Sequence, residues 1–122
     1  SKHFPCGVFV NRANKYDTLK LYPNGRFEQI VYNRQLKLVY HSISKWEKTL
    51  NGISIDSILL YDNIDSLYTI EEDNNQRNAG MNYDGFEYGY DNGVPIIYWE
   101  DYVDNPESAR IFELVRYLDS PI

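Results

Sequence analysis

Residues 18–29 read Thr18-Leu19-Lys20-Leu21-Tyr22-Pro23-Asn24-Gly25-Arg26-Phe27-Glu28-Gln29, two alternating runs joined by the clearest turn signal in the chain. Pro23 fixes φ at about −65°, and Asn24-Gly25 tolerates positive φ. Leu19, Leu21 and Phe27 recur with a period of two, which places them on one face of a two-stranded ribbon. The stretch predicts a β-hairpin, and such a hairpin needs further strands to be stable in water.

The rest of the chain supplies those strands. Two more hairpin dipeptides, Asn51-Gly52 and Asn92-Gly93, separate short runs of strand composition. Residues 67–70 have strand composition but are short, residues 71–80 are a polar tract that predicts an exposed loop, and residues 104–107 predict a turn or a single helical turn. Within the run at 53–60, Ile53, Ile55, Ser57 and Leu59 are expected to share a face. The predicted strands cover residues 7–10, 16–22, 26–33, 37–46, 53–60, 85–90, 94–99 and 110–117.

Composition supports an all-β protein. The 122 residues include 12 Tyr, and aromatic residues make up 16% of the chain, a balance that favours strands over helices. The segments between the predicted strands are too short for crossover helices, so sequential strands pair antiparallel. We therefore expect a single domain over residues 1–122, an antiparallel up-and-down β-barrel of about eight strands. A two-sheet β-sandwich is the alternative.

Several motifs resemble one family. The chain has an opening strand Gly7-Val8-Phe9-Val10, the hairpin at 18–29, Lys45-Trp46 and a late Phe112 after an Asp-Asn-Pro loop. In these features it resembles the lipocalin-like barrels of small bacterial lipoproteins and uncharacterised envelope proteins. The resemblance implies an eight-stranded barrel, no catalytic residues, and export by a cleaved lipoprotein signal with the anchoring Cys just before Ser1. The implied location is the periplasm or the outer membrane surface, with membrane contact only through a lipid anchor absent from this chain.

Charge is divided unevenly along the sequence. Residues 1–48 carry nine Lys/Arg and three Asp/Glu, whereas residues 49–122 carry three and fifteen, and the net charge is −6. The division predicts a polarised surface that could steer a charged partner, or simply the solvated outer positions of strands. The acidic total disfavours nucleic acid as a partner. It leaves open a local basic patch made of Lys15, Lys20, Arg26, Arg34 and Lys37.

The residues that could carry chemistry form no recognisable set. Cys6 is the only cysteine, so no disulfide can form within the chain. His3 and Cys6 are three residues apart, and with His41 elsewhere this spacing is weak support for a zinc site or a Cys-His nucleophile pair. The sequence has no Gly-x-Ser-x-Gly, no phosphate-binding glycine loop and no EF-hand pattern. We therefore expect no catalytic residues, no metal and no cofactor.

Polar side chains with inward phase are the candidate binding residues. Buried hydroxyls and amides need hydrogen-bond partners. They either bond to one another and to water, or line a small cavity in which a ligand supplies the partner. The candidates are Gln29, Tyr40, Ser42, Ser44, Trp46, Tyr88 and Tyr98.

Two functional hypotheses follow from the sequence. The first is a non-catalytic envelope binding module that engages a protein partner, for which an immunity or inhibitor role would suit a small acidic protein. The second is a carrier that holds a small apolar ligand in the barrel interior. An enzyme is the least favoured class, because no catalytic set is present.

Overall fold

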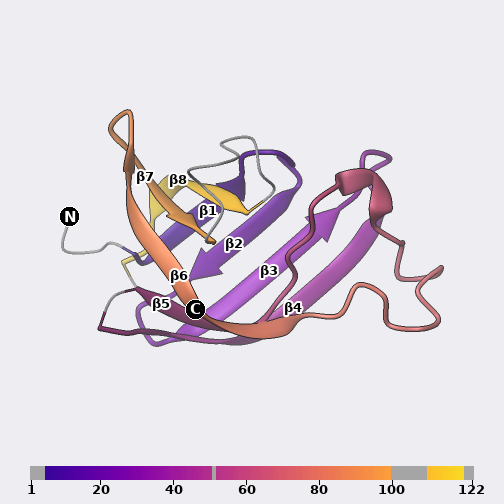
Figure 1. Cartoon of the computed structure of the whole chain (residues 1–122), viewed down its shortest axis with the longest axis horizontal. Coiled ribbons are helices and arrows are strands. Elements are labelled where there is room, and N and C mark those ends of the chain that lie inside the picture. The colour runs from indigo at the N-terminus through magenta and orange to yellow at the C-terminus, as the bar shows by residue number, and fades with distance from the viewer. Residues whose placement is uncertain (1–4, 51, 100–109, 120–122) are drawn as a thin grey trace.

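The computed structural model describes residues 5–50, 52–99 and 110–119. Eight antiparallel strands pair in sequence order and close into a β-barrel, as Figure 1 shows. This confirms the predicted up-and-down barrel. The strands are β1 Gly7–Asn11, β2 Asp17–Leu21, β3 Arg26–Tyr32, β4 Leu38–Lys48, β5 Ile53–Ile58, β6 Met81–Asp91, β7 Val94–Tyr98 and β8 Ile111–Tyr117, with one 3-10 turn, η1 Ile64–Ser66, between β5 and β6.

The predicted hairpin at 18–29 is confirmed as β2 and β3. The Tyr22 N–H donates to the Arg26 carbonyl at 2.9 Å, and the Gly25 N–H donates to the Tyr22 carbonyl at 3.0 Å. Gly25 has φ 87°, a left-handed conformation that costs glycine little. Leu21 pairs with Phe27 across the ribbon, and both side chains are fully buried.

The barrel interior is an apolar core. Inward side chains from seven strands lie with none of their surface exposed, and half-buried aromatic residues pack against them. Burying each large apolar side chain contributes about 1.5–3 kcal/mol, so this core is the main source of stability. Its fully buried members are Phe9, Leu19, Leu21, Phe27, Ile53, Ile55, Ile58, Phe86, Ile97 and Phe112.

Two expectations about β5 and β6 are wrong. The expected face breaks after Ile55, because Ser57 adopts φ 59° and the register shifts, so that Ile58 enters the core. The strand β6 begins at Met81 rather than at residue 85. Residues 67–70, for which the sequence left the structure open, form no strand. An alternating pattern carries no signal for a bulge, which displaces every later side chain by one position. The turn predicted at 104–107 lies outside the described residues.

Two junctions close the barrel in different ways. β1 pairs with β8 along its whole length, from Gly7 to Asn11. β4 pairs with β5 only through Trp46, Glu47 and Lys48, so residues 38–45 of β4 have no partner in β5. The connection between β5 and β6, residues 59–80, covers the end of the barrel beside β3 and β4, at the right of Figure 1.

Candidate interaction surface

A buried polar network lies at this end of the barrel. Asp17, at the start of β2, is fully buried and accepts three side-chain hydrogen bonds. The Tyr61 hydroxyl donates to Asp17 Oδ2 at 2.6 Å, Asn11 Nδ2 donates to the same oxygen at 3.1 Å, and Gln29 Nε2 donates to Oδ1 at 3.1 Å. Asn14 Nδ2 donates in turn to the Tyr61 hydroxyl at 3.1 Å. The network therefore joins three strands to the β5–β6 connection.

Burial dominates the electrostatics of this network. Removal from water raises the pKa of Asp17 to about 6, although the three donated hydrogen bonds act in the opposite direction. Burial and the neighbouring Asp17 carboxylate also raise the pKa of the Tyr61 hydroxyl, which stays protonated and remains a donor. Because every member has a bonding partner inside the protein, this group holds the structure together and does not face a ligand.

Further hydrogen bonds fix the β5–β6 connection over its length. The Gln29 amide bonds to both the N–H and the carbonyl of Leu59, at 2.8 and 3.1 Å. The Ile70 N–H donates to the Leu38 carbonyl at 3.1 Å, and Asn78 Nδ2 donates to the Val39 carbonyl at 3.2 Å. The polar tract at 71–80 is largely exposed, as predicted. Its buried Asn78 side chain nevertheless holds it against β4.

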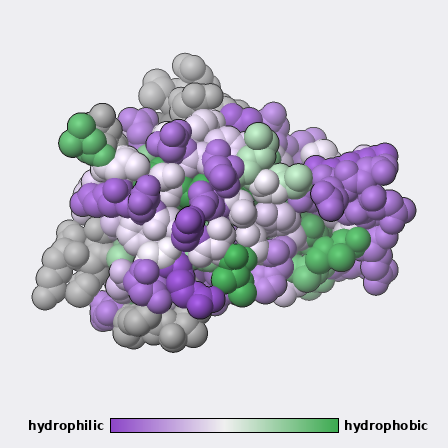
Figure 2. All heavy atoms as spheres, turned by 90° about the horizontal axis from the view of Figure 1, so that it is seen from below, coloured by the Kyte–Doolittle hydropathy of each residue, from purple (hydrophilic) through white to green (hydrophobic). Residues whose placement is uncertain are grey.

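A groove separates this connection from the turn between β3 and β4. It consists of two adjoining hollows of about 410 and 300 Å³ that share Lys37, Thr69 and Glu71. Figure 2 shows hydrophobic atoms beside a hydrophilic protrusion at the same end of the molecule. We call this feature the end groove. Its lining residues are Asn33, Gln35, Lys37, Leu38, Thr69, Ile70, Glu71 and Glu72.

Leu36 lies between two of the lining residues and is held in an unfavourable conformation. Its φ is 62°, in the left-handed region that a leucine adopts at a cost of about 1–2 kcal/mol. Its side chain is 60% exposed, and that of Ile70 is 53% exposed. The Asn33 side chain fixes the turn by accepting hydrogen bonds from the N–H groups of Gln35 and Lys37. The fold thus presents an apolar side chain to solvent at a strained position.

Three of the predicted interior residues use their polar groups to hold the barrel closed. Gln29 bonds to Asp17 and Leu59, as described above. The Tyr40 hydroxyl donates to the Ser57 carbonyl at 2.7 Å, and Trp46 Nε1 donates to the Tyr22 carbonyl at 2.8 Å. These contacts agree with the interpretation of the polar interior residues as bonded to the protein itself.

The other four predicted residues do not form one group. Ser42 and Ser44 are half-buried and pair with Gln29 and Phe27 in the β3–β4 ladder, so they point inward as expected. Tyr88 is half-buried and packs against the core. Tyr98 is one residue out of phase with the core residue Ile97, which places it on the opposite face of β7 from the interior.

Most members of the suggested basic patch have separate partners. Arg34 pairs with Asp65 at 3.0 Å, Lys20 lies 4.0 Å from Glu28, and Lys15 lies over the Tyr16 ring. Arg26, a further member of the patch, and Lys45, which lies outside it, have no ion-pair partner among the described residues. They are exposed and face each other across β3 and β4.

The metal-binding candidates lie apart. Cys6 is half-buried, which raises the pKa of its thiol. His41 is on the outer face of β4 and bonds to Glu28 at 2.8 Å, while His3 is outside the described residues. Within residues 5–50, 52–99 and 110–119, no three His, Cys, Asp or Glu side chains cluster as metal ligands would.

Asp17, Asn14 and Tyr61 were missed by the sequence analysis. Asp17 has the same period-two phase as Leu19 and Leu21, so alternation could have identified it as an inward carboxylate. Tyr61 gives no such signal, because it follows β5 in an irregular segment.

In the part of the chain that the structure describes, no helix is both long and apolar enough to cross a membrane. No family model, curated protein or solved structure matches the chain.

Proposed function

We propose that this protein is a non-catalytic binding module that engages a protein partner through the end groove. The observation that carries the proposal is Leu36, an exposed leucine held at φ 62° beside the groove. Strained backbone persists where the surrounding structure enforces it and is concentrated at functional sites. Exposed apolar side chains rimmed by polar ones are typical of protein interaction sites.

The composition of the groove suits a protein surface better than a small ligand. Ile70 and Leu38 provide apolar area, while Lys37, Glu71 and Glu72 provide charges of both signs at the rim. Interfaces of this kind combine an apolar centre with a polar rim. The carrier alternative has less support, because the interior positions are filled by fully buried side chains that a guest would have to displace.

The resemblance to envelope lipoproteins supports a location for this activity. A binding module in the periplasm or on the outer membrane surface would meet its partner while held at the membrane by a lipid anchor. An immunity or inhibitor protein would act in this way. Mass spectrometry of the mature protein from its native cells tests the anchor: an acylated N-terminal Cys before Ser1 is expected, and an unmodified N-terminus would contradict it.

The variant Leu36→Asn tests the groove directly. Asn adopts positive φ more readily than Leu, so this change should leave the free energy of unfolding unchanged or raise it by up to about 1 kcal/mol. We expect a protein that is captured from native cells by the wild type to be lost with Leu36→Asn. Val115→Asn, which alters a similarly exposed apolar residue of β8, is the matched control and should retain the partner.

Two results would contradict the proposed function. The first is capture of the same proteins by the wild type and by Leu36→Asn. The second is co-purification of a lipid, with displacement of a lipophilic fluorescent probe from the interior, which would favour the carrier.

A further inference from the structure

One edge of β4 has its main-chain groups directed away from β3 with no strand beside it. The Trp46 N–H donates to the Gly25 carbonyl at 2.9 Å, on the side of β3. The direction of the main-chain groups alternates along an antiparallel strand. The N–H and carbonyl groups of His41, Ile43 and Lys45 therefore point to the opposite side, where β5 would lie.

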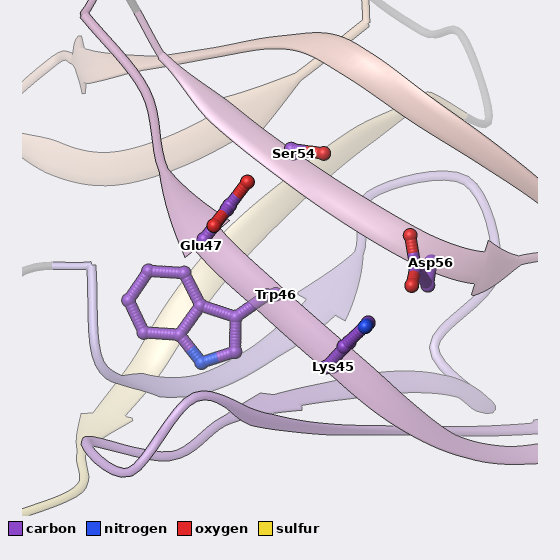
Figure 3. A pocket seen from close by; sticks show the side chains of 5 residues that line it. All are labelled: Lys45, Trp46, Glu47, Ser54 and Asp56. Carbon is purple, nitrogen blue, oxygen red and sulfur yellow. The ribbon is translucent and has the colours of Figure 1, made fainter.

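β5 turns away before it reaches these groups. The last pair of the β4–β5 ladder is Trp46 with Ile55, and because Trp46 bonds toward β3 this is a non-hydrogen-bonded pair. The alternation of the ladder then directs the Lys45 carbonyl to the Asp56 N–H, and beyond this point the two strands no longer pair. Ser57 adopts φ 59°, and its N–H donates to Asn82 Oδ1 at 3.1 Å. At the point of separation, which we call the fork, a hollow of about 120 Å³ is lined by residues of both strands. Figure 3 shows them: Lys45, Trp46 and Glu47 from β4, and Ser54 and Asp56 from β5.

Beyond the fork, β4 and β5 are further apart than paired strands, which lie about 4.8 Å apart. The Tyr40 side chain spans this space at full length, and its hydroxyl donates a hydrogen bond of 2.7 Å to the Ser57 carbonyl. Nearer the start of β4, the carbonyls of Leu38 and Val39 are occupied by Ile70 and Asn78. The unpaired stretch, which we call the β4 edge, is thus residues 41–45. Its other side pairs with β3, but no strand of the described part of the chain pairs with it on the side of β5.

The side chains at the β4 edge indicate the chemistry of an occupant. Ile43 is 57% exposed, although it lies in the middle of a strand. Next to it, Lys45 and Arg26 are direct cross-strand neighbours of the same charge, and neither has an ion pair with a described residue. Like charges directly opposite each other are destabilising, so an acidic group placed there would gain from both cations.

We infer that the β4 edge binds an extended, acidic segment of the protein partner by strand addition. An acidic side chain of the segment lies beside Lys45 and Arg26, and an apolar one lies beside Ile43. Main-chain hydrogen bonds to His41, to Ile43 and to the N–H of Lys45 supply affinity, and the side chains supply specificity. This inference rests on the proposed function, since it adds a second contact for the same class of partner.

The first test uses a fluorescently labelled synthetic peptide of nine residues, the Glu/Val peptide, in which every second residue is in turn Glu or Val and the residues between them are Thr. Its Glu and Val side chains then share one face, as Lys45 and Ile43 do on β4. Fluorescence anisotropy should show binding to the wild type, with weaker binding of a peptide that carries Lys in place of Glu. Two further peptides test the main-chain hydrogen bonds. One is N-methylated at the odd-numbered residues and the other at the even-numbered residues, and in a bound strand only one of these two sets of N–H groups faces β4. The peptide methylated on that set should bind at least about tenfold more weakly than the other methylated peptide. Amide hydrogen exchange at residues 41, 43 and 45 should slow when the Glu/Val peptide is bound.

Two variants of the chain complete the test. Ile43→Pro removes one N–H from the β4 edge without removing a hydrogen bond to β3, and should weaken binding at least about tenfold. Arg26→Glu combined with Lys45→Glu should reverse the preference, so that the Lys/Val peptide binds more tightly than the Glu/Val peptide. This pair of exposed changes keeps the test valid if Ile43→Pro does not fold.

Three results with the peptides would overturn the inference: no peptide binding at millimolar concentration, equal effects of the two methylated sets, or an unchanged preference in the charge-reversed variant. Protection of residues 41–45 that grows with protein concentration in the absence of peptide would assign the edge to a second copy of the chain, and would overturn it also. Leu36→Asn should bind the peptide as the wild type does. Failure at the β4 edge with loss of the cellular partner in Leu36→Asn would leave the proposed function intact.

Discussion

The two junctions that close the barrel differ in what holds them. Between β1 and β8 the main chains pair from Gly7 to Asn11, and they approach closely: a Cβ at Gly7 would lie 2.8 Å from the Arg116 carbonyl oxygen. Arg12 adds ion pairs to Asp91 at 2.9 Å and to Glu113 at 2.7 Å. Between β4 and β5 the main chains pair over three residues only, and side chains connect the rest.

The difference shows that side-chain hydrogen bonds can replace a main-chain ladder between two strands only in part. Gln29, Tyr61 and Tyr40 connect β2, β3 and β4 to residues 57–61 by directed hydrogen bonds, so the barrel stays closed without a continuous ladder. Side-chain bonds do not satisfy every main-chain group of β4, and an edge remains available. The junction made by the main chain pairs β1 from Gly7 to Asn11, whereas the junction made by side chains leaves both the β4 edge and the end groove beside it.

The largest expected effect comes from breaking the side-chain junction at its centre. Gln29→Leu removes three hydrogen bonds and leaves the buried N–H and carbonyl of Leu59 and one oxygen of Asp17 without these partners. Each unsatisfied buried group costs about 1–3 kcal/mol, so we expect the free energy of unfolding to fall by about 3–5 kcal/mol. Urea denaturation of both proteins measures this loss.

Ser42→Ala is the matched control for Gln29→Leu. Ser42 pairs with Gln29 in the β3–β4 ladder, yet no side-chain hydrogen bond involves it among the described contacts. Its replacement should change the free energy of unfolding by no more than about 0.5 kcal/mol. Equal losses in the two variants would show that the junction does not depend on the Gln29 amide.

The sequence predicted the β2–β3 hairpin far better than the side-chain junction. Alternation and turn residues identified the hairpin at 18–29 and the shared face of Leu19, Leu21 and Phe27, because both signals are local. The fork depends on Ser57 leaving the β region and on Tyr61 reaching Asp17 from 44 residues away. Neither event has a local pattern, so Gln29 could be recognised as an inward amide, but its partners could not.

The pH dependence of stability tests whether Asp17 is as deeply buried as the junction requires. Its pKa rises from 3.8 to about 6 on folding because burial disfavours the charged form. The folded state therefore binds more protons than the unfolded state between these values. Stability from this group is fully present below pH 3.8 and is lost as the pH rises to about 6, which amounts to about 3 kcal/mol.

Asp17→Asn isolates that contribution, since an amide does not titrate. Denaturation of both proteins from pH 4 to pH 7 should show the wild type losing roughly 2 kcal/mol relative to the variant as the pH rises, since part of the total is already lost at pH 4. Comparison with the variant cancels exposed groups such as Glu72, whose pKa is lowered by hydrogen bonds from Thr69. Parallel curves for the two proteins would mean that Asp17 has the same pKa in the folded and unfolded states.

The smallest effect compares the two junctions directly. Tyr40→Phe removes the donor to the Ser57 carbonyl, which should lower the free energy of unfolding by about 1 kcal/mol and speed amide hydrogen exchange in β5 near residues 56–58.

Arg12→Met removes the ion pairs at the other junction and should lower the free energy of unfolding by at most about 1 kcal/mol, because these partly exposed charges are screened by water and salt. Exchange in β1 and β8 should stay slow in Arg12→Met, since the main-chain ladder from Gly7 to Asn11 is untouched. If exchange at β1 and β8 rose as much as exchange at β5 does in Tyr40→Phe, the distinction between a junction held by main chain and one held by side chains would be wrong.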